Sequence, residues 1–142
     1  LVHLPFQSFG KKRSFSGPAQ TVKCFEDNTL IRAQLETPGE GRVLVVDAAC
    51  STRIAVMGDM LAELAIQNDW AGVVLNGAVR DSVEINEMST LVFALATSPV
   101  KSSKDGLGKV GGNIELGGVL ISPGKWIYAD ADGVLASDLK LA

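Results

Sequence analysis

The stretch GAVRDSVE, residues 77–84, places a cation beside an anion directly after the apolar run AGVVLN. Arg80 and Asp81 are neighbours in the chain, and a second carboxylate, that of Glu84, follows three residues after Asp81. Arginine binds anions through a planar fork of N–H donors, and a carboxylate can hold a hard metal ion or exchange a proton. A solvated turn can carry the same residues, so other parts of the chain must distinguish a turn from a site.

A second stretch, MGDMLAE at 57–63, has the pattern of a helix beginning. Aspartate is favoured at a helix N-cap because its carboxylate accepts hydrogen bonds from unpaired first-turn amides, which would give Asp59 an ordinary structural role. The same geometry also has a functional use. With Gly58 just before the helix, the backbone amides of Met60 and Leu61 can hold a bound carboxylate or phosphate.

One expected helix and one buried strand lead from Asp59 to Arg80 and Asp81. In an α/β sheet, helix N-termini and strand carboxyl ends lie at the same edge. We therefore expect Asp59, the two helix amides, Arg80 and Asp81 to converge at one mouth, with Gly77 letting the chain turn into it. Three separate features pointing to one place favour a site over a solvated turn.

Hydropathy patterns predict the elements that must position these residues. Continuous apolar runs predict buried strands at 43–49 and 71–77, and a third run predicts a strand at 91–98. Apolar residues at helical spacing predict a helix from about Asp59 to Asn68. Residues 26–36 predict a shorter helix capped by Asp27 or Asn28.

The remaining segments are shorter. An alternating pattern predicts a strand at 19–25, and turn signals separate short strands at 113–122, 126–130 and 133–137. Residues 1–17 are expected to be irregular, and 99–112 to form a charged, glycine-rich loop. Helical crossovers between the middle strands indicate an α/β fold with a mixed sheet, in a single domain over residues 1–142.

Composition excludes several classes of protein. The net charge of −3 gives no electrostatic reason to expect nucleic-acid binding, and no run of about 18 apolar residues predicts a membrane span. His3 is the only histidine, which argues against Ser-His-Asp catalysis and a histidine-rich zinc site. Cys24 and Cys50 are expected to be reduced thiols without a catalytic role, which pack as small hydrophobes beside apolar strands. Reduced cysteines and the lack of an evident signal peptide favour a cytoplasmic location.

Two nucleotide-related patterns fail on their context. GLGKVG at 106–111 has the spelling of a dinucleotide loop, but such a loop needs a strand before it and a helix after it. Here a charged loop precedes it and a strand pattern follows. VLVVDAACS at 43–51 has a faint likeness to a methyltransferase loop, but alanines and a cysteine stand where that loop needs glycines.

At GDMLAELAIQNDWAGVVLNGAVRD the sequence resembles the regulator of ribonuclease activity A (RraA)-like family. That family includes class II 4-hydroxy-4-methyl-2-oxoglutarate aldolases, and some members have been labelled demethylmenaquinone methyltransferases. The likeness continues through TVKCFEDNTLI, RVLVVDAACS and GGVLISPGKWIYADADGVLAS. It implies a compact β/β/α fold, a ring-shaped homotrimer with sites near subunit interfaces, and a divalent cation, Mg²⁺ or Mn²⁺.

The resemblance also implies roles for the residues above. Asp81 would hold the metal, largely with waters, and Arg80 would contact the pyruvyl group of a 2-keto acid. Residues Gly58, Asp59, Met60 and Leu61 would line the substrate site. Asp59 is the candidate for proton transfer through a water, and Glu84 would lie behind these groups, orienting waters or Arg80.

The implied reaction is cleavage of a carbon–carbon bond in a 2-keto acid that leaves a metal-stabilised pyruvate enolate. The family's aldolases carry a C-terminal glutamate that reaches a neighbouring subunit's site, and no equivalent is evident among these 142 residues. Oxaloacetate decarboxylation needs only the groups that stabilise the enolate. It is therefore better supported than aldol cleavage. The alternative is a non-catalytic protein that inhibits an RNA-degrading endonuclease by direct contact. A contact surface of this kind leaves no short sequence motif.

Overall fold

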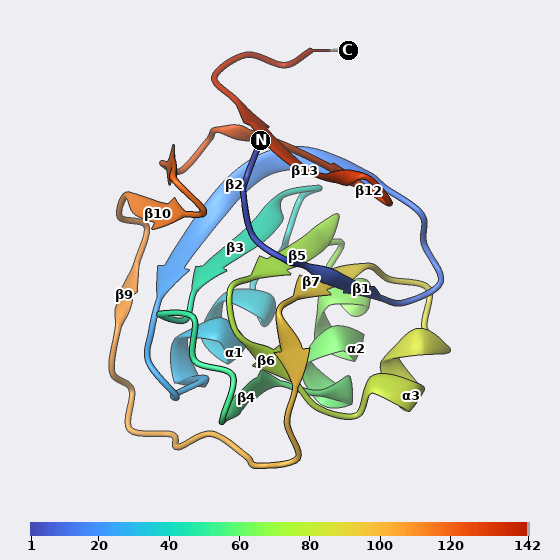
Figure 1. The fold of residues 1–142 in the computed structure, drawn as a ribbon, viewed down its shortest axis with the longest axis vertical. Helices are drawn as coiled ribbons and strands as arrows, with labels where there is room; N and C mark the ends of the chain where they lie inside the picture. Colours follow the sequence, from blue (N-terminus) through green and yellow to red (C-terminus); the bar gives the residue numbers. More distant parts are fainter. Residues whose placement is uncertain (142) are drawn as a thin grey trace.

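A curled, eight-stranded mixed sheet organises the molecule, and its strand order is β1-β7-β5-β3-β2-β12-β13 with β9 also paired to β2. The computed structural model describes residues 1–141 (Figure 1). The strands of this sheet are β1 (Gln7–Phe9), β2 (Phe15–Lys23), β3 (Val43–Asp47), β5 (Gly72–Leu75), β7 (Val92–Ala94), β9 (Lys109–Val110), β12 (Trp126–Asp130) and β13 (Gly133–Ser137). The central pairs from β2 to β7 are parallel, and the pairs at both ends are antiparallel.

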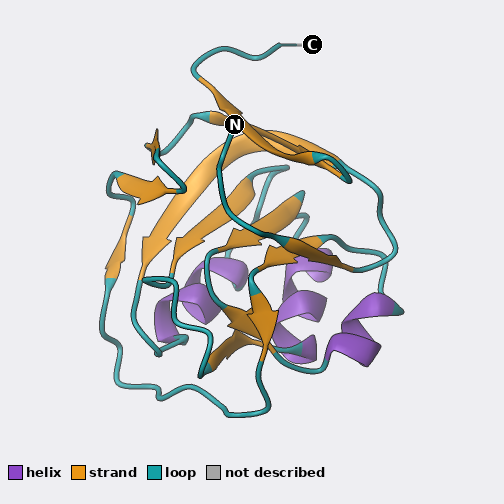
Figure 2. Cartoon of the chain, in the orientation of Figure 1, coloured by secondary structure: helices purple, strands orange, loops and turns teal. Residues whose placement is uncertain are grey.

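Two further small sheets and three helices complete the part of the chain that the structure describes. The helices are α1 (Thr29–Leu35), α2 (Asp59–Gln67) and α3 (Ser82–Asn86). One small sheet joins β4 (Ala55–Met57), β6 (Ala78–Val79) and β8 (Ala96–Thr97), and the other is the hairpin of β10 (Ile114–Leu116) and β11 (Val119–Ile121). The three helices lie together on one face of the main sheet (Figure 2). Among the described residues, no helix has the length and apolar character that crossing a membrane requires.

The central strands are buried on both faces, which explains why they are continuously apolar in sequence. Alternate side chains of β3 enter different cores because successive residues of a strand point to opposite faces. Leu44 and Val46 pack with the helices, whereas Val43 and Val45 pack with the β12–β13 hairpin. The central strands therefore lie between the helices on one face and the β12–β13 end of the same curled sheet on the other. This arrangement confirms the expected α/β class with a mixed sheet.

Several boundaries differ from those expected from sequence. The N-terminal 17 residues are not wholly irregular, because β1 pairs with β7 and β2 already begins at Phe15. The expected strand at 91–98 is broken into β7 and β8, and the expected strand at 113–122 is the β10–β11 hairpin. The loop at 99–112 contains β9, and α3 was not expected at all. Elements of two to five residues are too short to show a hydrophobic period.

Asp27 anchors the long loop after β8, although it was expected only as a cap for α1. It is 1% exposed, and its Oδ1 accepts a hydrogen bond from the Thr29 amide at 2.9 Å. Its Oδ2 accepts from the amides of Asp105 (2.8 Å) and Leu107 (3.3 Å). Burial acts to raise the pKa of Asp27, but these hydrogen bonds, with that of Thr29 foremost, outweigh it and hold the pKa below its ordinary value.

We predict that Asp27→Asn lowers the free energy of unfolding at neutral pH by about 1–3 kcal/mol, because one carboxamide oxygen cannot serve amides on both sides. Since the folded pKa of Asp27 lies below its unfolded value, its contribution is complete above the unfolded pKa and is lost as pH falls through the folded one. Urea denaturation at neutral and acidic pH should therefore show a gap between parent and variant that closes in acid. Asp105→Asn, which changes an exposed carboxylate of the same loop, is the control; an equal loss there would contradict the assignment.

Candidate functional site

The predicted convergence of Asp59 with Arg80 and Asp81 is present in the structure. Asp59 is the first residue of α2, and Arg80 and Asp81 follow β6 directly. The Asp59 amide donates a hydrogen bond to Asp81 Oδ2 at 3.2 Å, and the Arg80 amide donates to the Met57 carbonyl at 2.9 Å. Two segments that are far apart in sequence therefore meet at the N-terminus of α2.

The path to this meeting point is different from the expected one. Arg80 and Asp81 do not end the large buried strand, because β5 stops at Leu75 and the chain continues into β6 of the small sheet. That sheet pairs β4 with β6 in parallel, and β4 leads directly to Gly58 and α2. The small sheet therefore sets the two segments side by side, and β4 lies in a stretch where the hydropathy pattern predicted no strand.

Gly77 is needed for close packing and not for the turn that was expected of it. A Cβ atom added at this position would lie 2.9 Å from the Ala48 Cβ. The residues with positive φ among the described part of the chain do not include Gly77. The glycine therefore lets the segment after β5 approach the segment after β3.

Asp81 occupies a constrained backbone position at the candidate site. Its φ of 58° and ψ of 40° are left-handed, and it is the N-cap residue of α3. Few non-glycine residues adopt this conformation, although Asp and Asn do so more often than others. The Asp81 side chain makes no capping bond to α3 and turns instead to the first amide of α2. One carboxylate thereby links two helix starts.

Gly58 provides the space that this arrangement needs. A Cβ atom at Gly58 would lie 2.7 Å from Asp81 Oδ2 and 3.2 Å from Arg80 Cγ and Nε. The backbone of Gly58 is extended, with a φ of −130°, so conformation alone does not demand glycine there. The close approach of the two charged side chains does.

Asp59 and Asp81 form a pair of carboxylates in contact. Partial burial raises the pKa of Asp59, and the adjoining Asp81 carboxylate raises it further through a hydrogen bond and through repulsion. Glu84 adds a smaller repulsive effect of the same sign, while the Met60 amide acts in the opposite direction. Burial and the neighbouring carboxylates therefore together disfavour the charged form of Asp59.

Arg80 supplies the cation of the cluster. Its Nη1 lies 3.5 Å from Asp81 Oδ2, and its side chain is 31% exposed. The remaining N–H donors of the guanidinium are available to an anion that approaches from solvent. Among residues 1–141 no ion pair includes Glu84, which is exposed at the start of α3, so its expected contact with Arg80 is not formed.

The amides of Met60 and Leu61 that were expected at this site lie at the start of α2, together with the amide of Asp59. Because the first bond within α2 runs from the Ala62 amide to the Gly58 carbonyl, the amides of Asp59, Met60 and Leu61 precede the helical ladder. Asp81 accepts the first of them. The Met60 side chain is 63% exposed, whereas that of Leu61 is buried in the core, so Leu61 can offer a ligand only its backbone.

The donor set fits a hard divalent cation. No cluster of three or more His, Cys, Asp or Glu side chains poised to hold a metal occurs among residues 1–141. Asp59 and Asp81 nevertheless bring two carboxylates into contact, and their repulsion is the kind that a cation relieves. Mg²⁺ uses one or two protein carboxylates and keeps several waters or substrate oxygens, so this sparse set suits it.

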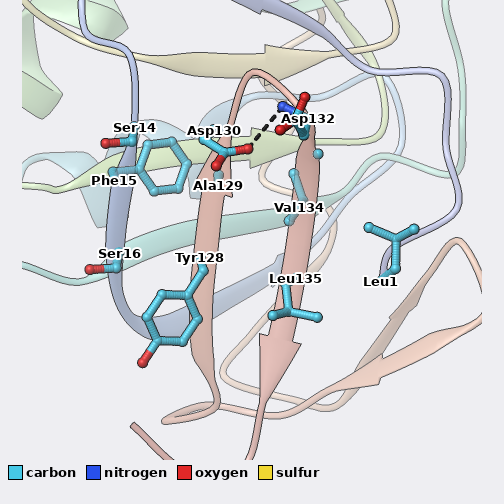
Figure 3. A pocket seen from close by; sticks show the side chains of 11 residues that line it. Leu1, Ser14, Phe15, Ser16, Tyr128, Ala129, Asp130, Asp132, Val134 and Leu135 are labelled. Carbon is cyan, nitrogen blue, oxygen red and sulfur yellow. Dashed lines mark hydrogen bonds between the residues drawn. The ribbon is translucent and has the colours of Figure 1, made fainter. Parts of the chain in front are cut away.

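The cavity at the β12–β13 hairpin suits a keto acid less well than this cluster does. A depression of about 490 Å³ lies against the β12–β13 hairpin, and its charged lining residues are Asp130 and Asp132 (Figure 3). The Asp130 side chain there accepts a hydrogen bond from the Asp132 amide. Two carboxylates without a cation would repel an acidic substrate. A groove of about 400 Å³ that does border the cluster runs from Asp59 along α2, between Arg32 and Met88.

The two cysteines are free thiols, as expected. Cys24 is buried, and desolvation together with nearby carboxylates raises its pKa to about 12, which makes it unreactive. Cys50 is exposed, so the expectation that it packs as a small hydrophobe is wrong.

Comparison with known proteins places the chain in a family. The RraA-like family model, described as Aldolase/RraA, matches residues 3–136. The chain belongs to the RraA-like family. A relative from Arabidopsis thaliana named "Putative 4-hydroxy-4-methyl-2-oxoglutarate aldolase 3" is 49% identical over 99% of this chain and 85% of its own length. A relative from Paraburkholderia phytofirmans, with the same name but no number, is 51% identical over 96% of this chain and 83% of its own length.

Two solved structures agree closely with this RraA-like fold. A Geobacillus kaustophilus protein named S-adenosylmethionine: 2-dimethylmenaquinone methyltransferase superposes with a TM-score of 0.97 at 50% identity, covering 99% of this chain and 88% of that one. The RNA-processing inhibitor RraA from Thermus thermophilis gives 0.95 at 42% identity, covering 100% and 86%. The expected resemblance is confirmed, and the aldolase names of relatives about 50% identical support an enzyme, a lyase.

We predict that Asp59→Asn stabilises the metal-free protein at neutral pH, because it removes one of two repelling carboxylates. The folded pKa of Asp59 is raised, so its destabilising effect appears as pH rises from the unfolded pKa and is complete above the folded one. Thermal unfolding in chelator should therefore show a higher Tm for the variant at neutral pH and no difference below about pH 3. Asp69→Asn, at an exposed acid just beyond α2, should not reproduce the effect; a lower Tm for Asp59→Asn at neutral pH would refute the repulsion.

Proposed function

We propose that this protein is a divalent-metal-dependent lyase for pyruvyl-containing 2-keto acids, which breaks the carbon–carbon bond between the carbons α and β to the keto group. The observation that supports this most strongly is the Asp59–Asp81 carboxylate pair beside Arg80 at the N-terminus of α2. Oxaloacetate decarboxylation and aldol cleavage of 4-hydroxy-4-methyl-2-oxoglutarate are the two reactions of this type. Both leave the enolate of pyruvate.

Asp81 would hold the cation as its direct protein ligand, with the Asp59 carboxylate beside it. A bound Mg²⁺ or Mn²⁺ would supply Lewis acidity, which stabilises negative charge on the keto oxygen. The left-handed backbone of Asp81 and its bond from the Asp59 amide fix the carboxylate before substrate arrives. Such preorganisation lowers the cost of reorganisation during the reaction.

Arg80 would bind and orient the substrate. Its guanidinium lies within 3.5 Å of Asp81, so an anion that approaches the metal site also approaches Arg80. Charge-assisted hydrogen bonds from the fork would hold the pyruvyl group and strengthen as the enolate oxygen gains charge. The free amides at the start of α2 would add further donors for a carboxylate.

Asp59 would move the proton. Its raised pKa brings the carboxyl closer to the range in which it can both accept and release a proton. In decarboxylation the bond to the departing carboxylate breaks and carbon dioxide leaves. The enolate that remains takes up a proton at carbon to give pyruvate. In aldol cleavage the base first removes the proton of the 4-hydroxyl group, and the bond between the third and fourth carbons then breaks. The hydroxyl-bearing carbon becomes the keto carbon of one pyruvate, and the bonding electrons pass to the enolate, which takes up a proton at carbon to give a second pyruvate. Glu84 would tune the charge around Asp59 from the start of α3.

The direct test is pyruvate release from oxaloacetate and from 4-hydroxy-4-methyl-2-oxoglutarate, with Mg²⁺ or Mn²⁺ and with EDTA. We expect release that EDTA abolishes and added metal restores. The rate must exceed that of the metal in buffer alone, because divalent cations promote oxaloacetate decarboxylation in solution. Turnover that is indifferent to EDTA would contradict the metal-dependent mechanism.

We predict that Arg80 and Asp81 separate in their effects. Asp81→Ala should remove metal affinity, whereas Arg80→Ala should leave it nearly unchanged and lower kcat/KM by at least about tenfold, since a charge-assisted contact is lost. Arg80→Lys should rescue poorly because a point charge does not replace a fork. Calorimetric metal titration and steady-state kinetics measure the two effects. If Asp81→Ala binds metal as the parent does, the cation site is elsewhere.

A second candidate function is inhibition of an RNA-degrading endonuclease through direct contact. It is favoured by the structural likeness to the RNA-processing inhibitor RraA from Thermus thermophilis. Tight binding to a ribonuclease scaffold without keto-acid turnover would support this function over the lyase.

We also propose a homotrimer, with the site near a subunit boundary. Large apolar side chains remain exposed in the single chain, among them Phe25 at 56% and Leu107 at 64%, which border one open apolar pocket. Exposed apolar area of this kind commonly marks a surface for association. Light scattering should report three times the chain mass at micromolar concentration, and a monomer under those conditions would contradict the proposal.

A further inference from the structure

A buried asparagine outside the proposed site ties together the two segments that carry it. Asn76 follows β5 and is 3% exposed. Its Nδ2 donates to Asp47 Oδ1 at 2.9 Å, and its Oδ1 accepts a hydrogen bond from the Ala48 amide. Asp47 is the last residue of β3 and also accepts from the Ala49 amide at 3.0 Å. The ends of two neighbouring parallel strands are therefore joined through side chains.

These strand ends are the points at which the site segments leave the main sheet. From Asp47 the chain runs through a loop to β4 and then to Gly58 and Asp59. From Asn76 it runs through Gly77 to β6 and then to Arg80 and Asp81. The β4–β6 ladder and the bond from the Arg80 amide to Met57 align the segments again at the site. The Asn76 contacts align them at their origin.

We infer that Asn76 is a positioning residue, which acts through Asp47 and Ala48 to set Asp59 against Arg80 and Asp81. This inference rests on the proposed function only for its kinetic consequence, because the geometric consequence exists without turnover. The hydrogen bond from the Asp59 amide to Asp81 Oδ2 is the contact that would change.

The chemistry of the pair explains why asparagine stands at this position. One side of the residue must accept from an amide, and the other must donate to a carboxylate. Aspartate would place a second carboxylate against Asp47 and lose the donor. Alanine would leave the Ala48 amide without its acceptor in a buried place, which costs more than an exposed lost bond. Serine keeps one polar group and is the mildest replacement.

The test uses full-length parent, Asn76→Asp, Asn76→Ser and the exchange variant Asp47→Asn/Asn76→Asp. The exchange variant keeps the net charge and puts the carboxylate on the other side of the pair. Asn68→Ala is the matched control, since the Asn68 side chain donates to the Leu35 carbonyl at 2.7 Å and joins α1 to the far end of α2. It removes a comparable bond away from the site.

Two readouts are needed, amide hydrogen exchange at Asp59 without metal and kcat/KM for oxaloacetate with metal. For Asn76→Asp we expect exchange at Asp59 to accelerate by at least about tenfold and kcat/KM to fall by at least about tenfold, with partial recovery of both in the exchange variant. Asn76→Ser should lie between parent and Asn76→Asp, and it replaces Asn76→Asp in the comparison if that variant does not fold. Asn68→Ala should lower Tm without changing either readout.

The inference is overturned if the Asn76 variant leaves Asp59 exchange within about twofold of the parent. It is also overturned if Asn68→Ala with an equal drop in Tm produces the same exchange and kinetic losses, because the effect would then be general destabilisation. A parent without turnover would count against the proposed lyase, while the exchange readout would still decide the role of Asn76.

Discussion

The hydrogen bond between the first amide of α2 and the Asp81 carboxylate is the contact on which the candidate site depends. It fixes one charged side chain at the point where two segments from different parts of the sheet meet. The left-handed backbone of Asp81 aims the carboxylate at that amide, and the missing side chain of Gly58 leaves room for it. A helix N-terminus carries partial positive charge, so this carboxylate is stabilised there before any ligand binds.

The second carboxylate changes the balance at this helix start. Partial burial of Asp59 raises its pKa most, and the hydrogen bond and repulsion from Asp81, with a smaller effect from Glu84, raise it further. The parallel pairing of β4 with β6 keeps the two carboxylates close together. Rigid placement of like charges is a normal way for a fold to prepare a site for a cation or a proton.

Sequence predicted the parts of this arrangement that follow from long patterns. The continuous apolar runs of β3 and β5 identified buried parallel strands, and helical spacing identified α2 to within a residue. The general rule that helix starts and strand ends share one edge was enough to bring Asp59 to Arg80 and Asp81. The rule predicted the correct proximity of these residues but the wrong strands leading to them. The strands β4 and β6 are too short to show a hydrophobic period, so their sheet was not predicted.

The residues that sequence could not assign are polar groups whose partners lie far away in the chain. Asp27 resembled a helix cap, yet its carboxylate holds amides of a loop 78 and 80 positions later. Asn76 stands directly before Gly77, a pair that is typical of turns, yet its partner Asp47 lies 29 positions earlier. Local propensity contains no information about such distant partners, since a turn former and a buried clamp use the same donors and acceptors.

The fold alone does not distinguish among the functions named for its relatives. Proteins named as a methyltransferase and as an RNA-processing inhibitor share this scaffold with TM-scores of 0.97 and 0.95. Function must therefore be argued from the site. A helix start that served only structure would need one capping group, and Asp81 provides it. The second carboxylate, Asp59, is partly buried beside Asp81, and the Met60 amide offsets the rise in its pKa only in part. A divalent cation bound between the two carboxylates would relieve their repulsion with the oxygen donors at hand, and the adjacent guanidinium of Arg80 would suit an acidic substrate of that cation.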